Sequence, residues 1–275
     1  MGSSDGRLRL SKHEGAGNDF LVLLDPSDGL RLSEAEVRNL CDRRRGIGAD
    51  GVIRVGAGGG AADLSMDLHN ADGGAAETSG NGLRCLAQAA VDAGLVDPPR
   101  FTVATGAGVV TVFFQRTETP EGDRATVDMG PVTLVGGPRT DPEGRPAQYA
   151  QTGNPHLVVR CDDPAQIDLA ALGPKAAAEF PDGVNVEYIA AGPGPDELTM
   201  RVFERGVGET WACGSGSCAA AAVARSWGMV GDVVQVRNPG GTLEVTLGAK
   251  DADPVLLGGP VRRVADVVVD RRVLA

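Results

Sequence analysis

The sequence predicts a strand-rich α+β fold, and three observations support this prediction. Forty glycines and 17 prolines in 275 residues require many turns. Few stretches show the long 3.6-residue periodicity of helices, whereas many short apolar or alternating runs have the length of strands. The plan of the first half recurs in the second half at an interval of about 130 residues, which predicts two similar domains.

The composition excludes several classes of protein. The net charge is −11 and no basic stretch stands out beyond residues 43–45, so nucleic acid is not an expected partner. No apolar run reaches the roughly 18 residues of a membrane span, and the polar N-terminus has no signal-peptide pattern. Five cysteines without CxxC spacing favour neither a metal site nor a disulfide framework, and they fit a reducing cytoplasm.

The first half is expected to contain two helices among short strands. Ser33 can cap the first helix, with Glu36 completing a capping box, and this helix should run to about Arg45. An apolar helix at 83–93 follows the turn Ser79–Gly82. Strands are expected at 8–10, 21–24, 52–55, 63–69, 101–105 and 109–114. The polar segment 117–123, with Pro120 and Gly122, is the expected linker.

The second half repeats this plan. A glycine-asparagine turn at 151–156 echoes the one at 15–20, and the distance from Asn18 to Ser79 nearly equals that from Asn154 to Cys213. A helical region is expected at 165–180, with a break at Gly173-Pro174. Strands are expected at 157–160, 185–189, 198–203, 233–237, 242–247, 254–257 and 264–273.

Cys213 lies where an alanine-rich helix is expected to begin. The first-turn N–H groups of a helix lack helical partners, attract anions and lower the pKa of a thiol placed there. The glycines at 214 and 216 allow a ligand to approach the backbone. A reactive thiolate is therefore one interpretation, and a glycine-containing turn with a small buried cysteine is the other.

Several motifs, in the same order along nearly the whole chain, resemble the diaminopimelate epimerases. They are His13–Phe20, Asn70–Gly73, Ser79–Gly82, Gly153–His156 and Glu204–Thr210 with Cys213–Gly216. The resemblance implies two pseudo-symmetric domains, each a mixed or antiparallel sheet wrapped round a central helix, with the active site in the cleft between them. The domains would be residues 1–118, with 264–275 returning to them, and 119–263. A cytoplasmic homodimer is also implied.

The resemblance implies an isomerase that needs neither pyridoxal phosphate nor metal and epimerises LL- to meso-diaminopimelate, for lysine and peptidoglycan synthesis. Cys213 would transfer protons at the α-carbon, and His156 with Glu204 would tune the thiol. The implied substrate-binding residues are Asn18, Asn70, Gly80, Asn81, Asn154, Asn185, Glu204, Arg205, Gly214 and Ser215. Arg205 would pair with the distal carboxylate, and the asparagines would recognise the distal amino group.

The sequence departs from the family at one catalytic position. The family's other cysteine falls at residue 79, which is serine here. A hydroxyl is a much weaker acid than a thiol and needs a neighbouring base, so we expect a working but slower enzyme. Cys85 is close in sequence but lies more than one helical turn further on, and we interpret it as a core residue.

Two other functions remain open from the sequence. Ser79 fits a related cofactor-independent epimerase that pairs serine with cysteine, of the hydroxyproline type. It also fits a non-catalytic ligand-binding homologue, which would be stabilised by a ligand without exchanging its α-proton. Taken alone, Asn70–Gly73 is a turn and His156 a structural histidine, and only the resemblance gives them a role in the site.

Overall fold

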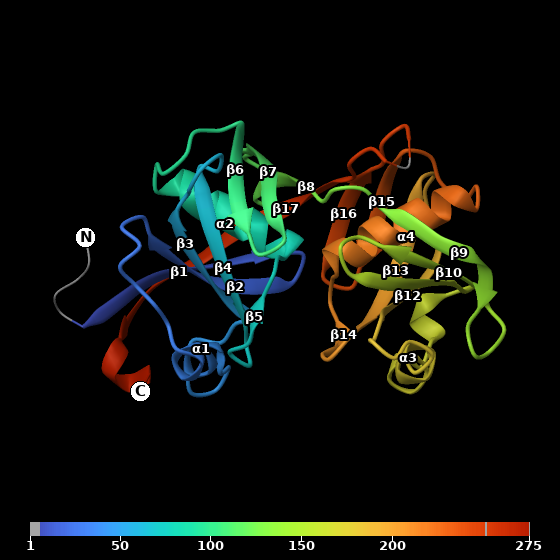
Figure 1. Ribbon diagram of the computed structural model, residues 1–275, viewed down its shortest axis with the longest axis horizontal. Helices are drawn as coiled ribbons and strands as arrows, with labels where there is room; N and C mark the ends of the chain where they lie inside the picture. The colour runs from blue at the N-terminus through green and yellow to red at the C-terminus, as the bar shows by residue number, and fades with distance from the viewer. Residues whose placement is uncertain (1–5, 251, 275) are drawn as a thin grey trace. The chain divides into compact units, whose positions relative to one another are not determined.

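The computed structural model describes residues 6–250 and 252–274 (Figure 1). They form a mixed, sheet-rich α+β fold with few helices, which confirms the predicted class. The chain divides into two compact units: the first runs to Val127 and resumes at Pro260, and the second is Asp128–Gly259. Because β8 (Asp123–Asp128) pairs with β7 (Gly108–Gln115), residues 123–127 belong to the first unit, beyond the predicted boundary at residue 118.

Neighbouring strands in the first unit pair in both orientations. Its other strands are β1 (Arg7–Gly15), β2 (Asn18–Asp25), β3 (Gly51–Ala57), β4 (Leu64–Asn70), β5 (Ala75–Ala76), β6 (Arg100–Thr105) and the greater part of β17 (Leu256–Asp270). β1 lies antiparallel to both β2 and β17, and β2 runs parallel to β3. β4 is antiparallel to β3 and parallel to β6, which begins an antiparallel run through β7 and β8.

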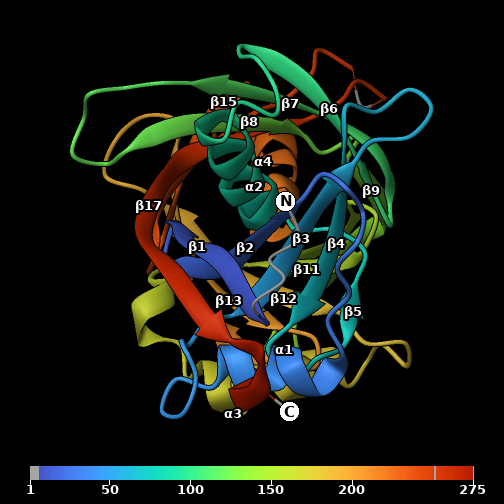
Figure 2. The same cartoon turned by 90° about the vertical axis from the view of Figure 1, so that its left-hand side faces the viewer.

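The helix α2 (Gly80–Asp92) is the centre of the first unit. Its residues from Gly80 to Ala90 are all buried, and it packs against β1, β2, β3 and β7. Figure 2 shows the strands of this unit on several sides of the helix. The shorter α1 (Glu34–Cys41) covers a second apolar cluster, in which Val37 and Leu40 join Leu21 and Leu23, and the 3-10 helix η2 (Arg271–Leu274) lies against α1.

The second unit has a comparable plan around α4 (Gly214–Ser226). Its strands are β9 (Thr133–Thr140), β10 (Pro146–Gln151), β11 (Pro155–Arg160), β12 (Asn185–Ala191), β13 (Glu197–Glu204), β14 (Gly208–Thr210), β15 (Val233–Asn238) and β16 (Gly241–Thr246). β11 runs parallel to β12 and β13 runs parallel to β15, while the remaining pairs are antiparallel.

Small side chains let α4 lie deep among these strands. The run Ala219–Ala221 is completely buried, and the helix packs against β10, β11, β12, β13, β15 and β16. A separate apolar cluster lies under α3 (Leu169–Ala177), where Leu169 and Leu172 meet Leu157 and Tyr188. Within the described residues, no helix is long and apolar enough to cross a membrane.

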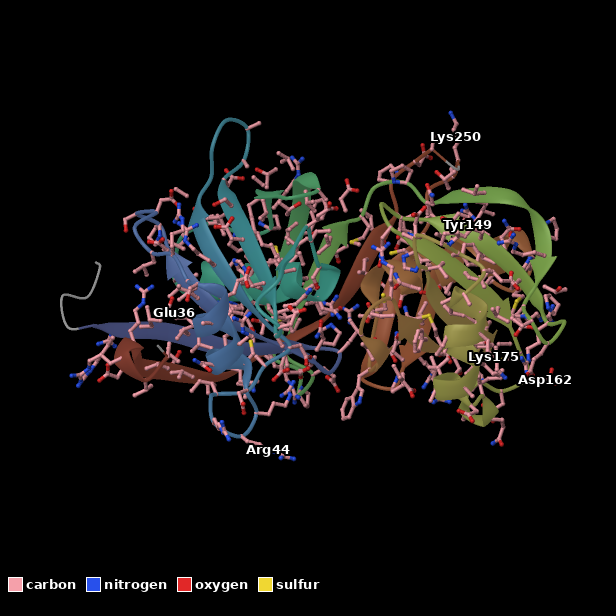
Figure 3. All side chains as sticks on the ribbon, turned by 60° about the horizontal axis from the view of Figure 1, so that its bottom comes forward. Glu36, Arg44, Tyr149, Asp162, Lys175 and Lys250 are labelled. Carbon is pink, nitrogen blue, oxygen red and sulfur yellow. The ribbon has the colours of Figure 1, made fainter. Side chains whose placement is uncertain are left out.

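The predicted helix limits differ from the structure by a few residues: the apolar helix expected at 83–93 is α2 at Gly80–Asp92. The capping box of α1 is present, with Glu36 (labelled in Figure 3) reaching back to the Ser33 backbone, but the helix ends at Cys41 instead of near Arg45. The predicted break at Gly173-Pro174 is wrong, because Pro174 lies inside α3. The interruption comes earlier, between the 3-10 helix η1 (Pro164–Gln166) and Asp168, which caps α3.

Candidate active site

The helix α4 begins at Cys213, as the sequence predicted. Cys213 is the N-cap residue, with extended backbone angles, and its Sγ accepts a hydrogen bond from the Gly216 N–H at 3.4 Å. The backbone carbonyl of Cys213 receives the N–H of Ser217 at 2.9 Å. The sulfur thus lies at the positive end of the helix dipole, where backbone N–H groups can also bind an anion.

Gly216 is required because two side chains lie against its α-carbon. A β-carbon at this position would stand 2.6 Å from Glu187 Oε1 and 3.2 Å from Cys213 Sγ. The glycine therefore lets the carboxylate of Glu187, on β12, approach the first turn of α4 beside the sulfur. From the sequence, this glycine was expected to let a ligand approach the backbone. The structure shows that it also makes room for the side chain of Glu187.

The expectation that the helix start lowers the pKa of Cys213 is wrong. Burial raises the pKa of this thiol well above its usual value, and the carboxylates of Glu204 and Glu187 raise it further. The Gly216 N–H and the Ser215 hydroxyl act in the opposite direction but are outweighed. The free-energy cost of removing a thiolate from water and placing it near two negative groups exceeds the stabilisation that the helix dipole provides at the N-terminus. Cys213 is therefore a protonated thiol in the resting protein.

Glu204, at the end of β13, is the carboxyl group with the largest electrostatic effect on the pKa of Cys213. Burial is the main reason that the pKa of Glu204 is raised, with Glu187 adding to the effect. The Thr210 hydroxyl donates a hydrogen bond to Oε1 of Glu204. A half-buried carboxyl group with a raised pKa near a thiol can exchange a proton with it.

His156 is completely buried, and both of its ring nitrogens have partners. Nδ1 lies 2.7 Å from Glu187 Oε1, and Nε2 lies 3.0 Å from Asn154 Oδ1. Sequence analysis named His156 and Asn154 but missed Glu187. The available signal was a charged residue between Val186 and Tyr188 in the predicted strand 185–189, because a carboxylate in a buried strand needs a partner.

Asn185 and Arg205 are linked to each other. The Oδ1 of Asn185 accepts a hydrogen bond from the Arg205 backbone N–H at 2.8 Å. The Arg205 guanidinium donates to the Asp182 carbonyl at 2.9 Å and passes over Gly183, where a β-carbon would come within 2.4 Å of Arg205 Cδ. Arg205 is otherwise exposed, so its remaining donors are accessible to a ligand.

The first unit carries the corresponding helix start. Ser79 is the N-cap of α2, and its Oγ accepts a hydrogen bond from the Gly82 N–H at 3.0 Å. Asn81 lies in the first turn and donates from Nδ2 to Asn18 Oδ1 at 3.2 Å. Asn18 in turn donates to Asp50 Oδ2 at 2.7 Å, so the two asparagines are held in a chain that ends on a carboxylate.

Arg43 completes this cluster. Its guanidinium lies 2.7 Å from Asp19 and 2.7 Å from Asp50, beyond the end of α1. Asn70, at the end of β4, has an exposed side chain, while its backbone closes a turn with Gly73 and Gly74. The turn interpretation of this segment is therefore correct, and the amide is also accessible.

The remaining cysteines take no part in either cluster. Cys85 has no exposed surface, and burial raises the pKa of its thiol to about 12, so its interpretation as a core residue is confirmed. Cys218 is completely buried and Cys41 nearly so, while Cys161 is half-buried at the end of β11. The five cysteines all lie in the described part of the chain, and none of them forms a disulfide bond.

The predicted site residues thus form two clusters, one in each unit. Ser79, Gly80, Asn81, Asn18 and Asn70 belong to the first unit. The second unit holds Cys213, Gly214, Ser215, Asn154, His156, Asn185, Glu204 and Arg205. Each cluster consists of a proton-bearing side chain at the N-cap of a buried helix, with amide groups close by.

Solved structures place this arrangement in a known fold. A hydroxyproline epimerase from Agrobacterium vitis, with bound trans-4-hydroxy-L-proline, has a TM-score of 0.73 at 18% identity, covering 97% of this chain and 93% of that one. A phenazine biosynthesis protein of the PhzF family from Bacillus anthracis has a TM-score of 0.74 at 16% identity, covering 96% and 99%. The protein therefore has the fold shared by these epimerases and PhzF proteins.

Sequence comparison is more specific. Residues 10–135 and 148–264 match the family model described as diaminopimelate epimerase. The chain is 40% identical over 278 residues to the diaminopimelate epimerase of Thermobifida fusca, covering 94% of this chain and 97% of the relative. It is 39% identical over 286 residues to that of Acidothermus cellulolyticus, covering 90% and 91%. The chain belongs to the diaminopimelate epimerase family.

Proposed function

We propose that this protein is an isomerase that interconverts LL- and meso-diaminopimelate by two-base proton transfer at the α-carbon. Family membership supports the reaction and its place in lysine biosynthesis. The observation that carries the chemistry is the buried thiol of Cys213 at a helix start, with the carboxyl group of Glu204 close enough to shift its pKa. One residue then donates a proton to one face of the carbon while another removes a proton from the opposite face.

The two helix starts would act together in this reaction. The N–H groups of Gly80 and Asn81 on α2, and of Gly214 and Ser215 on α4, would bind the α-carboxylate and stabilise the negative charge that develops at the transition state. This requires the two units to close around the substrate, with Cys213 and Ser79 on opposite sides of it. Exclusion of water would strengthen these interactions, because opposite charges attract more strongly in a medium of low dielectric constant.

Recognition of the distal end of the substrate falls to the outer residues. Arg205 would bind the distal carboxylate through the guanidinium donors left after its contact with Asp182. Asn70, Asn185 and Asn154 would surround the distal amino group. These groups suit a diamino diacid better than a cyclic amino acid. Ser79 is the one feature that favours a substrate of the hydroxyproline type.

Cys213→Ala tests the proposal, with NMR in D₂O following α-proton exchange and inversion of LL- and meso-diaminopimelate. We expect the wild-type protein to exchange and invert, and Cys213→Ala to lose both. Cys161→Ala is the matched control and should keep wild-type turnover, because Cys161 lies outside both clusters. If neither isomer exchanges while hydroxyproline inverts, the substrate is wrong. Ligand-induced stabilisation without any exchange would instead indicate a binding protein.

The resemblance also implies a cytoplasmic location and a homodimer. We propose the homodimer on the support of family membership. We propose the cytoplasmic location on the same support and because none of the five cysteines is in a disulfide bond, as expected in a reducing compartment.

A further inference from the structure

Glu187 is a buried carboxyl group to which the reaction described above assigns no role. It lies in β12 with no exposed surface, between Val186 and Tyr188, which are also completely buried. Its Oε1 contacts His156, and its Oε2 has no hydrogen-bond partner among the described residues. A half-satisfied carboxyl in an apolar strand costs stability, which suggests that it serves the site.

The hydrogen bonds around His156 determine how many protons the pair holds. Asn154 Oδ1 accepts a hydrogen bond from the Thr152 hydroxyl at 3.0 Å, so His156 Nε2, 3.0 Å away, must be the donor to the same oxygen. One further proton lies between His156 Nδ1 and Glu187 Oε1, across 2.7 Å. The pair is thus either carboxylate with imidazolium or carboxylic acid with imidazole. In the first form the negative end of the pair, Glu187 Oε1, is the end that lies beside Gly216 and the sulfur of Cys213.

The pair lies beside the sulfur of Cys213. Glu187 Oε1 and Cys213 Sγ flank the same α-carbon of Gly216, at 2.6 Å and 3.2 Å from the position of its missing β-carbon. The titratable groups that shift the pKa of the sulfur are Glu204 from β13 and Glu187 from β12, and His156 from β11 contacts Glu187.

Charged groups on the other strands that pack against α4 have partners of their own. On β15, Arg237 forms an ion pair with Glu197 at 2.9 Å. On β16, Glu244 accepts a hydrogen bond from Gln235 at 2.8 Å. Neither Arg237 nor Glu244 is among the causes of the Cys213 pKa shift, and both Glu187 and Glu204 raise that pKa.

We propose that Glu187 is a positioning residue for proton transfer at Cys213: its negative charge and the His156 ring that it holds keep Cys213 a proton-donating thiol until substrate binds. The inference rests on the proposed function and deepens it. In the donating step the S–H bond breaks as a C–H bond forms at the α-carbon. The electron pair stays on sulfur, where the Gly216 N–H and the Ser215 hydroxyl stabilise it.

Alkylation of Cys213 by iodoacetamide tests this role without requiring turnover. The rate is measured between pH 6 and 11 or so, and peptide mass spectrometry distinguishes Cys213 from the other four thiols. In the wild-type protein we expect a midpoint above the roughly 8.5 of a free cysteine. Glu187→Gln keeps the size and hydrogen-bonding capacity of the side chain but removes the charge. It should lower the midpoint by about one pH unit or more.

Glu179→Gln is the matched control, because it removes the same charge from an exposed position of the same unit and should leave the midpoint unchanged. A second readout is the pH profile of kcat, whose alkaline limb should move in the same direction in Glu187→Gln. Far-ultraviolet circular dichroism shows whether the variants fold.

Two results overturn the inference. One is a midpoint in folded Glu187→Gln equal to that of wild type. The other is a wild-type midpoint at or below about 8.5, which needs no variant. If alkylation shifts as expected but no α-proton exchange occurs in wild type, the proposed function fails while the role of Glu187 in setting the thiol stands. If exchange occurs but alkylation does not shift, the role of Glu187 alone is refuted.

Discussion

Ser79→Cys separates two tasks that share one atom, helix capping and proton transfer. The Ser79 oxygen accepts the Gly82 N–H at 3.0 Å, whereas the sulfur of Cys213 accepts the Gly216 N–H at 3.4 Å in the equivalent place on α4. Sulfur is the weaker acceptor, so the substitution should lose part of a cap worth about 1 kcal/mol. For a large domain, loss of the whole cap would lower the melting temperature by about 2–4 °C, so the substitution should lower it by less than this.

The same substitution should raise the rate of inversion. A thiol ordinarily has a pKa near 8.5, far closer to neutrality than a hydroxyl, and a well-matched acid or base contributes about 10²–10⁴ in rate. We expect kcat for LL-diaminopimelate to rise about tenfold or more. Stability and activity therefore change in opposite directions. Scanning calorimetry measures the first, and NMR in D₂O measures the second.

Ser79→Ala is the control for this experiment. It loses the cap without gaining a transferable proton, so it should be destabilised by a comparable amount and should no longer invert the substrate. The reasoning is refuted if Ser79→Ala inverts the substrate at the wild-type rate, because position 79 would then carry no proton. An unchanged kcat in Ser79→Cys would show that serine is already adequate and that another step limits turnover.

Two further predictions concern buried contacts. Gly216→Ala forces a β-carbon to within 2.6 Å of Glu187 Oε1. This overpacking should destabilise the protein by about 1–3 kcal/mol, partly offset by the better helix propensity of alanine. Displacement of the first turn of α4 should lower kcat about 100-fold. In Gly137→Ala the new β-carbon would meet no atom within 4 Å, so this variant should keep the stability and the kcat of wild type. Equal kcat values in the two variants would contradict the prediction. Burial raises the pKa of Cys85 to about 12, so above pH 9 the unfolded chain loses a proton that the folded protein keeps. Because of this thiol, the free energy of unfolding should fall by about 1.4 kcal/mol per pH unit above pH 9. Urea titrations at several pH values should show that the free energy of unfolding falls less steeply with pH in Cys85→Ala than in wild type. Equal slopes in the two proteins would count against a raised pKa for Cys85.

Sequence analysis succeeded where the cause of the structure is local. The capping box of Ser33 and Glu36, and the helix start at Cys213, depend on residues within one helical turn. Pro174 shows the limit of such signals. Its breaking tendency is local, but packing overrides it, since Gly173 lies against the Phe203 ring with no room for a β-carbon.

The sequence by itself determined the class of fold, the family and the helix start that bears Cys213. Only the tertiary structure decided the chemical state of the thiol. The parallel pairing of β11 with β12 brings Glu187 to His156, and burial beside Glu187 and Glu204 outweighs the helix start in setting the pKa of Cys213. Helix caps arise from neighbours along the chain, whereas desolvation and charge depend on which distant residues the fold places around an atom.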